Sequence, residues 1–475
     1  MKYEAVIGLE VHAELLTKSK CFCSCSTEFG NEPNTQICPI CSGFPGVLPV
    51  LNRTAVEMAI KTGLALHCEI ASYSRFARKN YYYPDLPKNF QISQYAEPLT
   101  QHGYLEVPTK TGLKKIGITR VHLEEDAGKL MHSPDGYSLV DLNRTGQPLM
   151  EIVSEPDMRS PEDAKDYLMM LRAMVQYLEV CNGNMEEGTF RCDANVSIRP
   201  EGAKEFGTKA EIKNMNSFKN VQKALEYEVE RQIAATENGE RIVQETRLWN
   251  PDKGITESMR SKEFAHDYRY FPEPDLVPME ISKEWIAEIQ ATMPELPIAR
   301  KDRFITEYQI PEYDAILLTA SKPVAEFYED TVKLHSNPKS ISNWIMTELM
   351  RELTGKEFRY TEFPITPTQL AGLVKLIDAN TINGKTAKQV FSAILRTETT
   401  PENYVKEKGL IQITDTSAIE KIVDEVIAKN EPTVAEYKKG KEGAINALVG
   451  QVMKASKGKA NPQMVNQLLK QKLSA

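Results

Sequence analysis

Long apolar runs are missing from this sequence, and cysteine is scarce. No stretch reaches the roughly 18 consecutive apolar residues that a membrane-spanning helix needs, and no apolar signal region opens the chain, so we expect a cytoplasmic protein without a membrane span. No GxGxxG occurs, which argues against a dinucleotide-binding loop of that pattern. The chain has eight cysteines in 475 residues, too few for a disulfide framework. Five of them lie between Cys21 and Cys41, and this crowding favours a metal site.

Charge is distributed unevenly along the chain. From Lys438 to Ala475 there are eight lysines and one acid, a formal charge of +7; because the whole chain carries −8, the preceding 437 residues carry −15. An acidic body suggests metal-nucleotide chemistry, and a basic tail suggests a polyanionic partner with a phosphate backbone. Lys454, Lys457 and Lys459 have no acid near them and are the candidate contacts, although a solvated charge run is the usual explanation.

A chain of this length needs more than one hydrophobic core, so two or three domains are expected. Residues 1–292 combine polar-faced strands with helices over 161–180 and from Ser217 onward. Helices of moderate length then occupy 293–400, and a small basic helical unit occupies 401–475. We therefore predict an α+β fold in which a strand-rich N-terminal domain precedes two helical ones.

Four of the cysteines form two close pairs, Cys23-x-Cys25 and, twelve residues later, Cys38-x-x-Cys41. Two such pairs joined by a loop can converge into a tetrahedral zinc site. Four thiolates leave no open position for catalysis, so a structural role is expected for this insert at 21–46. The alternative is a set of free buried thiols. The spacing alone also allows a Cys21/Cys23 pair.

The stretch from Tyr3 to Leu15 predicts a strand with an unusual polar face. Its apolar residues alternate onto one side: Ile7, Leu9, Val11, Ala13 and Leu15. Its other side carries Glu10, His12 and Glu14. Two carboxylates and an imidazole on one rigid face are suitable ligands for a hard divalent cation. A solvated strand face is the alternative.

Four later segments repeat this alternation, which favours a shared site. Their polar faces carry His122, Glu124 and Asp126; Glu151 and Glu155; Arg191, Asp193, Asn195 and Ser197; and Lys209, Glu211 and Lys213. Carboxylates that converge repel one another unless a cation lies between them, and Mg²⁺ with a nucleotide would serve. Edge strands that face water show the same pattern. The alternation assigns faces and leaves strand order open.

Basic and aromatic residues are interleaved between 75 and 95. They are Arg75, Arg78, Lys79, Lys88, Tyr81, Tyr82, Tyr83 and Phe90. Cations suit phosphate groups, and aromatic faces stack on a base. A surface patch of aromatic and solvated basic residues is the alternative.

Long motifs resemble one family, the B subunits of bacterial tRNA-dependent (aspartyl/glutamyl-tRNA) amidotransferases, over essentially the whole chain. They are GLEVHAEL (8–15), FCSCSTEFGNEPNTQICPICSGFPGVLPVLN (22–52), KNYYYPDLPKNFQISQY (79–95), HLEEDAGK (122–129), DLNRTGQPLMEIVSEPD (141–157), RCDANVSIR (191–199), EIKNMNSF (211–218), SKEFAHDYRYFPEPDL (261–276) and NPQMVNQLL in the tail. Cys21 departs from the family pattern, which has an apolar residue there, and this favours the set Cys23, Cys25, Cys38 and Cys41 for zinc.

The resemblance implies a fold, a reaction and partners. It implies a mostly antiparallel β "cradle" domain with the catalytic site over 1–292, then a helical domain, and a tail domain that binds tRNA. ATP would phosphorylate the side-chain carboxylate of glutamate or aspartate on the wrong tRNA, and ammonia would then displace the phosphate. An amidase (A) subunit would supply the ammonia, and a small C subunit would complete a heterotrimer.

The resemblance also implies roles for particular residues. Residues assigned to Mg²⁺ or ammonia handling are His12, Glu125, Glu10, Glu151, Asp193 and Glu211. ATP contacts are assigned to Lys79, Tyr82 and Lys88. Because Glu124 and Glu125 alternate onto opposite faces, only one of them can join the acidic group, and the resemblance favours Glu125. Two other functions would be compatible with the same polar strand faces. One is a stand-alone metal-dependent hydrolase, and the other is a non-catalytic scaffold that binds zinc and RNA.

Overall fold

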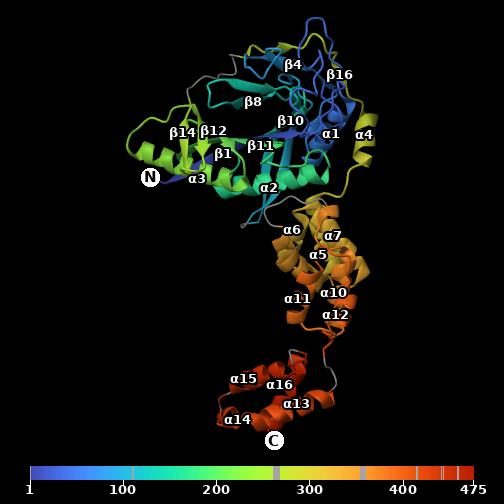
Figure 1. Ribbon diagram of the computed structural model, residues 1–475. Coiled ribbons are helices and arrows are strands. Elements are labelled where there is room, and N and C mark those ends of the chain that lie inside the picture. Colours follow the sequence, from blue (N-terminus) through green and yellow to red (C-terminus); the bar gives the residue numbers. More distant parts are fainter. Residues whose placement is uncertain are drawn as a thin grey trace. The chain divides into compact units, whose positions relative to one another are not determined.

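The computed structural model describes residues 2–109, 112–259, 268–353, 360–412, 416–439, 441, 443–456 and 459–474. The chain divides into two compact units, Met1–Arg300 and Lys301–Ala475. Figure 1 shows sheet and helices together in the first unit and helices in the second. Within the described residues, no helix combines the length and apolar character that crossing a bilayer requires.

The first unit is built on a large mixed sheet. Its nine described strands follow one another in the order β14 (Ile255–Ser258), β13 (Glu245–Asn250), β12 (Ala210–Met215), β11 (Phe190–Pro200), β1 (Tyr3–Glu14), β10 (Pro148–Ser154), β7 (Gly112–Glu125), β6 (Thr100–Thr109) and β2 (Glu69–Ile70). Neighbours are antiparallel except β12 and β13, which run parallel. The prediction of an α+β fold with a mostly antiparallel N-terminal sheet is confirmed.

Helices cover the apolar face of this sheet. They are α1 (Arg53–Ala65), α2 (Pro161–Tyr177) and α3 (Phe218–Glu237), and they share one core with the strands (Figure 1). Helix α3 begins where the sequence predicted, because the Ser217 hydroxyl accepts a hydrogen bond from the backbone N–H of Asn220 at 3.2 Å. On β1, Ile7, Val11 and the other apolar residues face this core, as predicted. The opposite face of the sheet is therefore left to the polar side chains.

Short strands close the rest of the first unit. Strands β4 (Ala77–Asn80), β5 (Phe90–Ser93) and β15 (Phe271–Pro272) form one small sheet, β3 (Tyr73–Ser74) pairs with β16 (Met279–Glu280), and β8 (Lys129–His132) pairs with β9 (Ser138–Asp141). Helix α4 (Lys283–Ala291) packs on α1. Strand β5 also contacts β7, which brings the basic and aromatic segment to the sheet.

The second unit is helical and contains two hydrophobic cores. The first core lies among α5 (Pro297–Tyr308), α6 (Glu312–Thr319), α7 (Lys322–Leu334), α8 (Pro338–Trp344), α9 (Met350–Glu352), α10 (Pro367–Asp378), α11 (Gly384–Ile394) and α12 (Pro401–Glu407). The second lies among α13 (Thr416–Lys429), α14 (Glu431–Lys438), α15 (Ala444–Ala455) and α16 (Pro462–Ser474). A π-helical turn, Ile345–Leu349, joins α8 to α9. The domain boundaries at 293 and 401 remain predictions.

Candidate functional site

Three residues from three strands form a compact cluster on the polar face. They are His12 on β1, Glu124 on β7 and Glu151 on β10, and one ligand atom of each lies within 4.8 Å of the others. His12 Nε2 is 3.6 Å from Glu151 Oε2 and 3.7 Å from Glu124 Oε1. The strand register explains the meeting, because His12 lies directly opposite Glu151 on the neighbouring strand. We define these three residues as the carboxylate–imidazole cluster.

His122 completes the surroundings of this cluster. It lies opposite Glu151 in the pairing of β10 with β7, and only 2% of the residue is exposed. Its Nε2 atom is 3.3 Å from Glu151 and 3.9 Å from Glu124. The sequence placed His122 on this polar face but did not single it out as a site residue. Its position two residues before Glu124 was the available signal.

The electrostatics of the cluster fit a bound cation. Burial alone would lower the pKa of His12, but the neighbouring carboxylates of Glu151 and Glu124 raise it to about 9. Burial opposes ionisation of Glu151, yet His122 and His12 hold its pKa well below the usual range. Positive charge is therefore favoured between these carboxylates. Carboxylate oxygens and an imidazole nitrogen are donors that accept a divalent cation in the same place.

Glu125 lies outside this three-residue cluster, and its assignment to Mg²⁺ or ammonia handling remains a prediction. Its carboxylate forms an ion pair with Lys88 and accepts a hydrogen bond from the Ile92 N–H at 2.9 Å. The next residue of β5, Ser93, donates instead to Glu124 at 3.2 Å. Adjacent residues of a strand point to opposite faces, so the two glutamates enter different surroundings.

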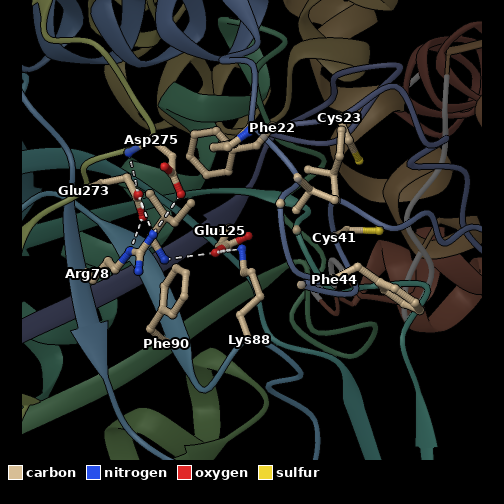
Figure 2. A pocket seen from close by; sticks show the side chains of 17 residues that line it. Phe22, Cys23, Cys41, Phe44, Arg78, Lys88, Phe90, Glu125, Glu273 and Asp275 are labelled. Carbon is tan, nitrogen blue, oxygen red and sulfur yellow. Dashed lines mark hydrogen bonds and ion pairs between the residues drawn. The ribbon is translucent and has the colours of Figure 1, made fainter.

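Glu125 and Lys88 line a separate cavity of about 160 Å³ (Figure 2). Its wall also includes three aromatic rings, Phe22, Phe44 and Phe90. The Arg78 guanidinium stands at the same cavity and forms two hydrogen bonds with Glu273, at 2.7 and 2.9 Å, and one with Asp275 at 3.0 Å. The cations of this cavity therefore already have carboxylate partners.

The residues predicted to contact ATP lie in different surroundings. Lys79 does not line the cavity that contains Lys88; its ammonium lies 4.8 Å from the centre of the Tyr268 ring. Burial opposes ionisation of Glu124, but the neighbouring imidazole of His122 and the charges of His12 and Lys79 lower its pKa. The charge of Lys79 therefore acts on Glu124 of the carboxylate–imidazole cluster. Tyr82 lies in the loop between β4 and β5 and is 74% exposed.

A second acidic group extends along the same polar face and contains Glu10, Asp193 and Glu211. The Lys213 ammonium lies 3.3 Å from a carboxylate oxygen of both Asp193 and Glu211, and Asn195 donates to Glu10 at 2.9 Å. Burial, followed by the charges of Glu151, Glu211 and Asp193, raises the pKa of Glu10. A hollow of about 260 Å³ opens beside Glu10. The structure therefore brings these three predicted residues together, next to the cluster rather than within it.

Glu14 and Asp126 form a pair of carboxyl groups near the end of β1. Burial, followed by the charge of Asp126, raises the pKa of Glu14 to about 8. Asp126 accepts a hydrogen bond from Arg191 Nη2 at 2.7 Å, and although burial opposes it, Arg191 and Arg144 lower its pKa. Near neutral pH, Glu14 therefore keeps a proton beside an ionised Asp126.

Replacing Glu14 with Gln is expected to remove a loss of stability on going from about pH 5 to about pH 8. The folded chain keeps the Glu14 proton up to a pKa of about 8, whereas the ordinary value is 4.5. Within that window the folded state binds more protons, so the free energy of unfolding falls as pH rises, by on the order of 1 kcal/mol per pH unit at most. Urea unfolding at both pH values measures the slope. A variant with the wild-type slope would contradict the assignment.

The predicted cysteine set converges. Sulfur atoms of Cys23, Cys25, Cys38 and Cys41 all lie within 4.8 Å of one another. Cys21 is fully buried elsewhere, and nearby Glu125 contributes, after burial, to raising the pKa of its thiol. Four sulfurs at this spacing fit a tetrahedral thiophilic ion such as Zn²⁺. We call these four residues the thiolate cluster.

Some predicted residues lie in the tail or outside the described part of the chain. Lys454 is exposed near the end of α15, and Lys459 follows that helix. Lys457 lies outside the described residues, as do His266 and Asp267 of the SKEFAHDYRYFPEPDL motif. The candidate tRNA contacts therefore remain predictions.

Comparison with known proteins identifies the family. Residues 5–287 match the model described as the GatB/GatE catalytic domain, and residues 326–473 match the GatB domain. The B subunit of the aspartyl/glutamyl-tRNA(Asn/Gln) amidotransferase of Thermodesulfovibrio yellowstonii is 59% identical over 469 residues, covering 99% of both chains. The protein of the same name from Carboxydothermus hydrogenoformans is 58% identical over 477 residues, covering 100% of this chain and 99% of its own. Since both halves match and the relatives are similar from end to end, this chain belongs to the family of aspartyl/glutamyl-tRNA(Asn/Gln) amidotransferase B subunits.

Proposed function

We propose that this chain is the subunit that carries out ATP-dependent amidation of Glu-tRNA(Gln), Asp-tRNA(Asn) or both. The observation that carries the proposal is the carboxylate–imidazole cluster, which lies within the part of the chain that matches the family's catalytic domain. The related proteins are named for the same tRNA-dependent amidotransfer.

The chemistry needs positioning and charge rather than a protein nucleophile. The side-chain carboxylate of the tRNA-bound amino acid attacks the γ-phosphorus of ATP, and the bond to ADP breaks. Ammonia then attacks the resulting acyl phosphate, and phosphate leaves. His12, Glu124 and Glu151 would hold Mg²⁺, which supplies positive charge to the transferring phosphoryl group.

Other residues of the polar face take supporting roles in this proposal. The charge of Lys79 acts on Glu124, and Lys79 would contact ATP phosphates together with Tyr82, which is exposed in the adjoining loop. Lys88, predicted to contact ATP, and Glu125, predicted to handle Mg²⁺ or ammonia, form an ion pair in a separate cavity, so each would contribute to the reaction as part of this pair. Glu10 lines a hollow of the polar face, Asp193 and Glu211 lie close enough for their charges to raise its pKa, and the three carboxyl groups would receive and orient ammonia.

The proposal also includes metal and partners. The thiolate cluster would bind Zn²⁺ as a structural ion, since its four sulfurs fill a tetrahedral shell. An amidase subunit would produce the ammonia from glutamine, and a small third subunit would complete a heterotrimer. The basic tail would contact the tRNA backbone.

The experiment that tests the function is ADP release from the purified complex with and without misacylated tRNA. Amidation requires release that depends on the charged tRNA and on the partner subunits. Release by the isolated chain without tRNA would instead support a metal-dependent hydrolase. An absence of release under all conditions, with tRNA binding intact, would support a scaffold.

Deleting residues 416–475, from α13 onward, is expected to raise the KM for tRNA and to leave the affinity for ATP unchanged. Helix α12 is retained because it belongs to the core that it shares with α10 and α11. The tail carries lysines that are candidate phosphate contacts, whereas the polar face lies in the first unit. Each lost phosphate contact should also reduce the salt dependence of tRNA binding. Steady-state kinetics of the truncated complex at two salt concentrations measures both. A loss of ATP affinity would contradict the assignment of tRNA binding to the tail and of ATP binding to the first unit.

A further inference from the structure

Lys20 is an unusual buried cation next to the thiolate cluster. The residue is 0% exposed. Its ammonium donates to Cys41 Sγ at 3.7 Å and to the backbone carbonyl of Leu142 at 3.3 Å. Among the described residues, no ion pair joins Lys20 to a carboxylate.

A buried ammonium without an anionic partner is strongly unfavourable. Because no carboxylate pairs with it in the described structure, the Cys41 sulfur must supply the negative charge as a thiolate. Four thiolates around a divalent cation carry an excess of negative charge, and a neighbouring cation reduces it. The Cys41 thiolate thus offsets the free energy of burying the Lys20 ammonium, and the ammonium reduces the repulsion among the four thiolates.

The second partner of Lys20 belongs to the connection between β7 and β10, which carry Glu124 and Glu151. The Leu142 N–H donates to Asn34 Oδ1 at 2.8 Å, and the Gln36 N–H donates to Asn143 Oδ1 at 2.8 Å. Gly146, at φ +82°, packs within this corner; a Cβ there would lie 3.4 Å from Cys41 and 3.6 Å from Lys20. The insert and the connection are therefore packed as one piece.

We propose that Lys20 is a positioning residue that stabilises the metal-bound thiolate cluster and ties it to the β7–β10 connection. One ammonium group neutralises Cys41 and holds the Leu142 carbonyl. The proposal rests on the proposed metal binding by the four cysteines, and it concerns how long a bound metal stays rather than whether it binds. Metal content therefore tests the first idea, and the rate of metal loss tests the second.

The test compares Lys20→Met with Lys18→Met, since Lys18 lies two residues away and is exposed. Zinc release from the purified complex is followed with excess chelator and a chromogenic indicator. Lys20→Met should release zinc about tenfold faster or more, the range seen when outer-shell partners of a metal site are removed. Hydrogen exchange of residues 138–147 should also accelerate. Lys18→Met should behave as wild type, and equal release from all three proteins would overturn the proposal.

Two further measurements keep the proposal testable if Lys20→Met folds poorly. Lys20→Gln retains N–H donors without the charge, so release as slow as in wild type would overturn the role of the charge. In the wild-type complex, lysine acylation followed by mass spectrometry should modify Lys18 and spare Lys20 while metal is bound. Acylation of both lysines at the same rate would show that Lys20 is not buried against the cluster.

Discussion

Replacing Glu124 with Gln should reduce tRNA-dependent ADP release by about a hundredfold or more, because it removes a charged ligand from the proposed Mg²⁺ site. Glu124 lies 3.7 Å from His12 and is buried, so solvent cannot compensate for the loss of its negative charge. The remaining His12 and Glu151 would hold Mg²⁺ more weakly. The Mg²⁺ concentration that gives half-maximal activity should therefore rise. Steady-state ADP release over a magnesium titration measures both effects.

The adjacent Glu125 provides the decisive comparison. Glu125→Gln leaves the Lys88 ammonium buried without its partner, so we expect a stability loss of about 3–5 kcal/mol. The magnesium requirement of the folded protein should stay unchanged. Glu155→Gln, at an exposed position beyond β10, serves as the control for a charge change on the same surface. A magnesium requirement that rises with Glu125→Gln but not with Glu124→Gln would contradict the assignment.

Replacing Cys41 with Ser should abolish metal binding by the insert and destabilise the first unit. Cys41 is buried at the centre of the contacts described above, and its sulfur lies 3.9 Å from that of Cys38. Structural zinc contributes its binding free energy to folding, so the loss should exceed that of an ordinary core substitution, which is about 2–5 kcal/mol at most. Metal content by mass spectrometry and urea unfolding measure the two consequences.

Cys21→Ala is the matched control for this ligand test. Cys21 is as deeply buried as any residue of the core, but its sulfur stays outside the thiolate cluster. The substitution should cost only the packing of a small side chain and should retain the metal. If Cys21→Ala loses the metal, or if Cys41→Ser keeps it, the proposed ligand set is wrong.

The sequence alone determined the faces of the strands and the composition of the insert. Alternation along β1 separated the core side, with Ile7 and Val11, from the side with Glu10 and His12, because a strand has a period of two residues. The two close cysteine pairs predicted a four-sulfur cluster, because short spacings restrict where each pair can reach. These are local properties of the chain, and the structure shows both arrangements.

Only the tertiary structure decided which of these faces meet. His12 reaches Glu151 and His122 because β1 pairs with β10 and β10 pairs with β7, and such long-range register is not encoded in the period of any one strand. In the same pairing Glu124, and not its neighbour Glu125, lies beside His12 and Glu151. It also brought Lys20 and Leu142 together across 122 positions of sequence. Side-chain chemistry was readable along the chain, whereas the distances between side chains were set by strand order and packing.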